Sequence, residues 1–176
     1  YKVTTQEKGQ HVVLFSFIKS VGLYGWTPTN PKKGDPGFFE LFDHVHQVIG
    51  KLARDLPKVH FTIKAKWPGP WSNEITTSLA LGGIDYSNLA NLEITSDIAA
   101  QDLIISSDVV VSFGSTTMLE AAIAGKPVIV PSFSEAAAPE YQGYIQLKDT
   151  YAAYDIATSP GNLYDLIMYS IHHLIL

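Results

Sequence analysis

Four adjacent residues near the middle of the chain have the types and the order of an anion-binding turn: Gly114, Ser115, Thr116 and Thr117. Glycine adopts backbone conformations that are closed to other residues, and serine and threonine are common helix caps. Placed just before helix-forming sequence, they would direct backbone N–H groups and hydroxyls toward a ligand. The turn therefore predicts a phosphate site.

Two lysines could bring positive charge to the same site. Lys64 and Lys66 end a segment, 57–66, in which apolar and polar residues alternate, so both point to one side of a predicted strand. Ligands of open α/β sheets bind outside the carboxyl ends of the strands. One of the two lysines would then contact a nucleotide diphosphate, although two solvated lysines at a strand end explain the pattern almost as well.

Glu120 is the one carboxylate in the helix that should follow the turn. An acidic residue near a nucleotide phosphate site can accept hydrogen bonds from ribose hydroxyls. The segment from Thr117 to Glu120 also fits a capping box, which satisfies free N–H groups without a ligand. The residues alone leave both interpretations open.

Other chemistries lack their sequence signals. The Walker A pattern and the Gly-x-Gly-x-x-Gly fingerprint are both absent, which disfavours ATP hydrolysis and hydride transfer. The chain has no cysteine, so thiolate metal sites and a cysteine nucleophile are excluded. His44 and His46 lie two residues apart on a predicted helix and therefore face different directions. We expect no metal site and no cofactor.

The elements that must position these residues alternate between strands and helices. The β-branched runs Val109–Val111 and Val128–Val130 flank a helix-forming segment, which predicts a βαβ crossover and parallel strands covered on both faces. We therefore predict an α/β fold, a Rossmann-like three-layer sandwich with a mainly parallel sheet. Periodicity predicts further strands over 11–18, 57–66, 91–95 and 144–147, and helices starting at Asp35-Pro36 and over 73–81, 98–106 and 162–176.

Several loops could add to the site. The long loop 19–34 is either a ligand-facing element or a mobile surface loop. Trp67 and Trp71 could stack on a base or simply cover an apolar edge. The loop 132–135 falls at the same strand edge as the turn and is a further candidate.

Composition restricts the class of protein. The chain has 176 residues, 46% of them hydrophobic and 16% charged, with a net charge of −5. These values predict one globular domain over 1–176 and argue against nucleic-acid binding. No apolar run has membrane-spanning length and the first residues do not form a signal peptide, so we expect a soluble protein. Because the chain lacks an initiator Met and ends in apolar residues, we expect a fragment of a longer two-domain protein.

The segment Asp108–Thr117, followed by Glu120–Ile129, resembles the carboxy-terminal, donor-nucleotide-binding domain of GT-B glycosyltransferases, especially those that build bacterial surface and capsular polysaccharides. The close similarity runs from about Lys58 to Ser134. The resemblance implies phosphate contacts at Ser115, Thr116 and Thr117 and a ribose contact at Glu120.

Two departures from the family pattern bear on the reaction. Many members carry a His-Pro pair where this chain has Trp67-Pro68. Retaining relatives carry a second glutamate at the position of Ser112, so the resemblance favours an inverting transfer. The catalytic base usually belongs to the amino-terminal domain, and we expect the isolated domain to bind nucleotide without transferring sugar.

The resemblance thus implies transfer of a sugar from a nucleotide-activated donor, which is a substrate and not a cofactor, to a glycan or lipid-linked acceptor. The expected location is cytoplasmic, at the inner face of the membrane, with peripheral membrane association left open. A nucleotide-sugar 2-epimerase of GT-B fold and a non-catalytic α/β assembly module are the alternatives.

Overall fold

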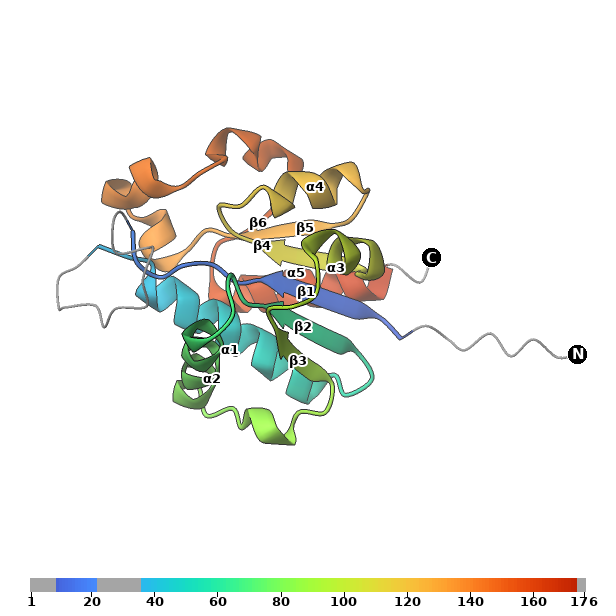
Figure 1. Ribbon diagram of the computed structural model, residues 1–176. Helices are drawn as coiled ribbons and strands as arrows, with labels where there is room; N and C mark the ends of the chain where they lie inside the picture. The colour runs from blue at the N-terminus through green and yellow to red at the C-terminus, as the bar shows by residue number, and fades with distance from the viewer. Residues whose placement is uncertain (1–8, 22–35, 174–176) are drawn as a thin grey trace, which may run out of the picture.

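The computed structural model describes residues 9–21 and 36–173 and contains a six-stranded sheet (Figure 1). The strand order is β3-β2-β1-β4-β5-β6, and every pairing between neighbours is parallel. The prediction of an α/β, Rossmann-like fold is therefore confirmed. The strands are β1 (His11–Phe15), β2 (His60–Lys64), β3 (Leu92–Thr95), β4 (Val109–Ser112), β5 (Val128–Pro131) and β6 (Asp155–Ala157).

Helices cover both faces of the sheet, as right-handed crossovers between parallel strands require. The helices α1 (Phe39–Asp55), α2 (Pro70–Leu81) and α5 (Pro160–His173) pack on one face (Figure 1). The shorter helices α3 (Ala100–Ser106) and α4 (Thr117–Ile123) lie on the other. The predicted βαβ unit is β4-α4-β5. No helix among the described residues is long and apolar enough to span a membrane.

The apolar periodicity of the sequence accounts for the core. The middle residues of β1 and β4 are buried completely because helices cover both of their faces. The stripe predicted for α1 also lies in the core, with Leu41, Val45 and Leu52 fully buried. The other members of that stripe are Phe38, Phe42, Val48 and Ile49.

The sheet topology creates a switch point between β1 and β4. The chain leaves β1 toward β2 and β3, whereas from β4 it continues toward β5 and β6. Ligand crevices of open α/β sheets form outside the carboxyl ends of the strands at such a point. There Phe15 at the end of β1 is in register with both Lys64 and Ser112.

The predicted start of α1 at Asp35-Pro36 is wrong. Pro36 precedes the helix, which begins at Phe39, and Asp35 lies outside the described residues. The free amides of the first turn are instead satisfied from far along the chain, because Glu40 and Leu41 donate to the carboxylate of Glu135 at 2.7 and 2.9 Å. The loop 132–135, a candidate site element in the sequence, thus supplies a helix cap.

The predicted strand over 144–147 is also wrong. Residues Pro139–Tyr144 form a 3-10 turn, and Leu147 has a left-handed backbone conformation with φ of 59°, which an extended strand cannot contain. The sixth strand comes later, at β6, where it pairs with β5. Two further helices start earlier than the sequence predicts. The predicted starts are residues 73 and 162, whereas α2 begins at Pro70 and α5 at Pro160, both with Pro at the first helical position.

Candidate functional site

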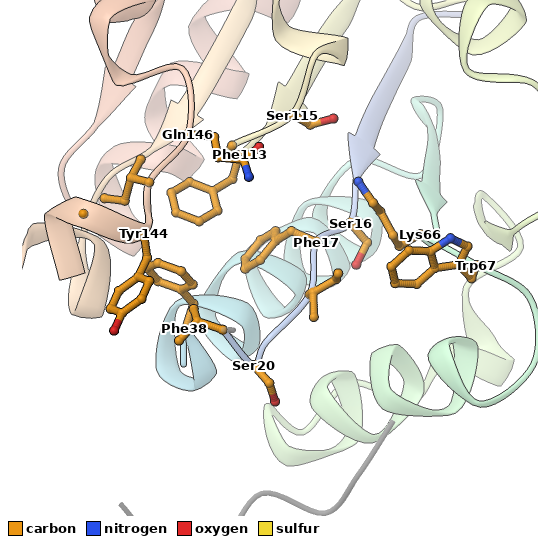
Figure 2. Close-up of a pocket in the computed structure, with 15 residues that line it drawn as sticks. Ser16, Phe17, Ser20, Phe38, Lys66, Trp67, Phe113, Ser115, Tyr144 and Gln146 are labelled. Atoms are coloured by element: carbon orange, nitrogen blue, oxygen red, sulfur yellow. The ribbon is translucent and has the colours of Figure 1, made fainter. Parts of the chain in front are cut away.

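A cavity of about 440 Å³ lies at the switch point, where β1, β2 and β4 end (Figure 2). Its walls come from the segments that follow these three strands and from residues 143–146. It is therefore placed where the topology predicts a ligand site. The lining residues are Ser16, Phe17, Ile18, Ser20, Val21, Phe38, Lys66, Trp67, Phe113, Gly114, Ser115, Gly143, Tyr144, Ile145 and Gln146.

Lys66 is the one lysine or arginine among the described residues that line this cavity. Its side chain is exposed, and its Nζ lies 6.0 Å from the centre of the Trp67 ring. Lys64 does not line the cavity, because its Nζ donates to the carbonyl oxygen of Ser96 after β3. The structure thus separates two lysines that the sequence pattern treats alike.

The turn after β4 contributes Gly114 and Ser115 to the cavity. Gly114 has φ of 58°, so a side chain at this position would be strained. Thr117 does not line the cavity: its hydroxyl is hydrogen-bonded at 2.8 Å to the buried hydroxyl of Ser112. The amide of Met118 is also engaged inside the turn, where it donates to the carbonyl oxygen of Ser115 at 3.1 Å.

Thr116 and Glu120 lie beside the cavity without lining it. The Thr116 hydroxyl donates to one carboxylate oxygen of Glu120 at 3.2 Å, and the Gln101 amide donates to the other at 3.3 Å. A capping box from Thr117 to Glu120 does not form, because Thr117 is the first helical residue and its hydroxyl faces Ser112. The ribose role of Glu120 stays a prediction that needs a ligand extending over the turn.

Aromatic side chains make one wall of the cavity. The Phe113 ring lies 5.1 Å from both the Phe17 and the Phe38 rings, in edge-to-face arrangements that aromatic pairs prefer. Trp67 stands at the other side beside Lys66, while Tyr144 flanks Phe38 (Figure 2). Of the two tryptophans considered for stacking, Trp67 lines the cavity, and Trp71 packs against the hydrophobic core.

Ser16 is a cavity residue that the sequence did not single out. It directly follows β1, and its hydroxyl lies 2.9 Å from Nε2 of the buried His46 on α1. His46 Nδ1 is 2.6 Å from the carbonyl oxygen of Phe42, and burial lowers the pKa of His46 to about 4. One sequence signal could have identified Ser16 as a site residue: it is a polar residue between the apolar Phe15 and Phe17 at the end of a strand.

The histidines do not form a metal site. His44 is partly exposed and approaches Ser134, whereas His46 points into the core, as the spacing of two residues predicts. No cluster of metal-ligating side chains occurs in the described part of the chain. The loop expected over 19–34 lies outside the described residues from position 22 onward.

The cavity can hold an anionic ligand that also carries an apolar or planar part. Lys66 supplies positive charge, the turn at Gly114 and Ser115 supplies polar groups, and the phenylalanines supply an apolar wall. The fold and this site together define a Rossmann-like α/β domain with a candidate ligand cavity at the switch point of its sheet.

Comparisons with known proteins agree with this class. No protein-family model and no curated protein matches the chain. Among solved structures, it resembles the UDP-GlcNAc 2-epimerase from Neisseria meningitidis bound to UDP-GlcNAc, with a TM-score of 0.60 and 15% identity over 95% of this chain. It also resembles the C-terminal domain of a glycosyl transferase group 1 family protein (LpcC) from Francisella tularensis, with a TM-score of 0.53 and 14% identity over 93% of this chain and 75% of that one.

The E. coli heptosyltransferase WaaC with ADP is similar at a TM-score of 0.52 and 13% identity over 94% of this chain. The chain spans 37% of the length of the epimerase and 45% of that of the heptosyltransferase. At these identities the likeness establishes the fold.

Proposed function

We propose that this chain is the donor-binding domain of a glycosyltransferase that uses a nucleotide-activated sugar. The observation that carries the proposal is the position of Lys66 and of the turn at Gly114 and Ser115 around one cavity at the switch point. Both features would act on the phosphates of the donor, as a point charge and as hydrogen-bonding groups.

The rest of the cavity suits the remaining parts of such a donor. The phenylalanine wall offers an apolar surface, and Trp67 offers a ring face on which a base could stack. Because the whole chain has a net charge of −5, attraction of an anion depends on this local charge. Thr116 and Glu120 would contact a donor only where it extends over the turn toward α4.

In sugar transfer, the groups that bind the diphosphate also stabilise it as the leaving group. Negative charge grows on the phosphates as the bond between the sugar and the diphosphate breaks. Fixed hydrogen-bond donors and positive charge stabilise this charge and lower the free-energy barrier of the transfer. Deprotonation of the acceptor hydroxyl requires a base. We assign that base to a second, amino-terminal domain, and the presence of Ser112 in place of a glutamate favours inversion.

The resemblance to polysaccharide-building enzymes extends the proposal to the acceptor, which would be a glycan or lipid-linked sugar. Such an acceptor is met at the inner face of the membrane, so the proposed location is cytoplasmic and peripheral to the membrane. The donor is a substrate, and the proposed reaction uses no metal or other cofactor.

A nucleotide-sugar 2-epimerase is the second candidate, favoured by the structural likeness to an enzyme of that activity. The full-length protein distinguishes the two. A transferase releases nucleoside diphosphate only when an acceptor is added, whereas an epimerase converts the nucleotide sugar without an acceptor. A non-catalytic assembly module would do neither.

The first test is a thermal-shift panel with UDP, CDP, GDP, ADP, CMP and phosphate. A ligand at about 100 times its dissociation constant adds about 2.7 kcal/mol of stability, enough to raise the midpoint by several degrees. We expect one nucleoside diphosphate to raise it and Thr116→Ala and Glu120→Ala to reduce the shift. If no nucleotide shifts the domain or the full-length protein at millimolar concentration, the proposed function is wrong.

A further inference from the structure

The hydrogen bond between Ser16 and His46 has a fixed direction. A carbonyl oxygen can only accept, so the contact between His46 Nδ1 and the carbonyl of Phe42 places the imidazole proton on Nδ1. In a neutral imidazole, Nε2 is then an acceptor. The Ser16 hydroxyl must therefore donate to Nε2 across the 2.9 Å that separate them.

This direction determines what Ser16 offers to a ligand. Its only hydroxyl proton is directed into the core at His46, and its lone pairs remain for the cavity that it lines. The residue cannot turn freely, because its amide donates to the carbonyl of Lys64 at 2.9 Å and its surface is only 8% exposed. Ser16 lies between Phe17 and Lys66 in the wall (Figure 2).

A serine beside a histidine could also be an activated nucleophile, but the surroundings oppose that role. An imidazolium formed at His46 would face the carbonyl oxygen of Phe42. In enzymes with a serine nucleophile, a carboxylate usually occupies this position and stabilises the charged histidine. Burial lowers the pKa of His46 to about 4, and the nearby Lys19 acts in the same direction. His46 is thus a poor base near neutral pH and an effective permanent acceptor.

We propose that Ser16, held by His46, is a fixed hydrogen-bond acceptor that selects a hydroxyl or N–H group of the bound ligand and repels its phosphate oxygens. The cavity is then divided by polarity. Lys66 and the turn at Gly114 and Ser115 form the side that binds anions, and Ser16 forms the side that binds a neutral donor group. This inference rests on the proposed function, since it assigns a part of a nucleotide sugar to each side.

The proton position is tested without any ligand. The ¹⁵N chemical shifts of His46 in the full chain should show a protonated Nδ1 and an unprotonated Nε2 at neutral pH. The opposite tautomer would let Nε2 donate to Ser16, free the hydroxyl proton for the cavity, and overturn the inference.

Ligand selection is tested with Ser16→Ala and the control Thr77→Ala, which removes an exposed hydroxyl of α2 outside the cavity. The probes are UDP-N-acetylglucosamine, GDP-mannose and ADP-glucose. They are compared with inorganic pyrophosphate, which contains the phosphates but neither a sugar nor a nucleobase. Loss of one hydrogen bond should weaken binding of the preferred nucleotide sugar by about 3- to 10-fold. Pyrophosphate affinity should stay within about twofold, and Thr77→Ala should change neither affinity.

Each other outcome has a separate meaning. Equal weakening of nucleotide sugar and pyrophosphate, or no weakening of either, overturns the inference and leaves the proposed function intact. Failure of the wild-type protein to bind any nucleotide sugar overturns the proposed function, and the ligand assignment of Ser16 with it. The thermal midpoint of each variant shows that it is folded before binding is compared.

Discussion

Glu135 caps the first turn of α1 from another part of the chain: its Oε2 accepts the amide proton of Leu41 at 2.9 Å. The other carboxylate oxygen accepts from the amide of Glu40 at 2.7 Å. The negative charge also lies at the positive end of the helix dipole. One side chain therefore replaces the local N-cap that α1 lacks.

Glu135→Ala should lower the free energy of unfolding by about 1–2 kcal/mol, because it leaves two helix amides without their partner. Urea denaturation of the variant measures the loss. The control is Glu140→Ala, which removes an exposed glutamate from the neighbouring 3-10 turn. Equal stability of the two variants would show that the cap contributes nothing.

His46 should make stability depend on pH in the acid range. Its pKa is lowered from 6.5 to about 4 in the folded chain, chiefly because burial disfavours the charged form. Between these values the unfolded chain binds more protons, so stability is full above pH 6.5 and falls as the pH decreases toward 4. The loss attributable to His46 is about 3 kcal/mol at pH 4.

Denaturation curves of His46→Gln between pH 4 and 7 test this slope. The variant should be less stable than wild type at pH 7, and the difference between them should shrink toward pH 4. His44→Gln, on the same helix but partly exposed, should keep the wild-type slope. If the unfolding free energy of His46→Gln depends on pH as steeply as that of the wild type, the acid sensitivity comes from other groups.

Asn91 joins the end of α1 to the start of two strands. Its Nδ2 donates to the carbonyl oxygens of Ala53, Leu56 and Val59 at 2.9, 3.0 and 2.8 Å. Asn91→Ala should cost about 1–3 kcal/mol of unfolding free energy, since these carbonyls lose the hydrogen bonds from the Asn91 amide.

The isosteric Asn91→Asp should cost more than the alanine variant at pH 7. It has the same shape but places a carboxylate against three carbonyl oxygens. Chemical denaturation compares both with Asn73→Asp at an exposed position of α2. An aspartate variant at least as stable as the alanine variant would mean that donation by Asn91 is unimportant.

The sequence predicts those parts of the fold that depend on local patterns. The β-branched runs of β4 and β5 are buried on both faces, and the apolar stripe of α1 is buried as its spacing of three and four residues requires. Such patterns can be recognised within one segment of the sequence, because they depend only on which of its side chains face a covering layer.

Features that depend on distant residues were not predictable. The start of α1 is determined by Glu135, 94 residues from Leu41 in sequence, and the edge strand β6 has only three residues with little apolar pattern. The site shows the same limit. Lys64 and Lys66 are equivalent in the strand pattern, but in the structure the carbonyl of Ser96, in a different loop, holds Lys64 while Lys66 lines the cavity.

The difference between these two lysines also gives the most direct test of the proposed donor site. Titration calorimetry of the domain with the best-binding nucleoside diphosphate should show that Lys66→Ala weakens binding at least about 10-fold, as expected for loss of a charged partner of the phosphates. Lys64→Ala should change the affinity by less than about twofold, because Lys64 is held by Ser96 outside the cavity. Equal effects of the two substitutions, or unchanged affinity in Lys66→Ala, would contradict the assignment of this cavity as the donor site.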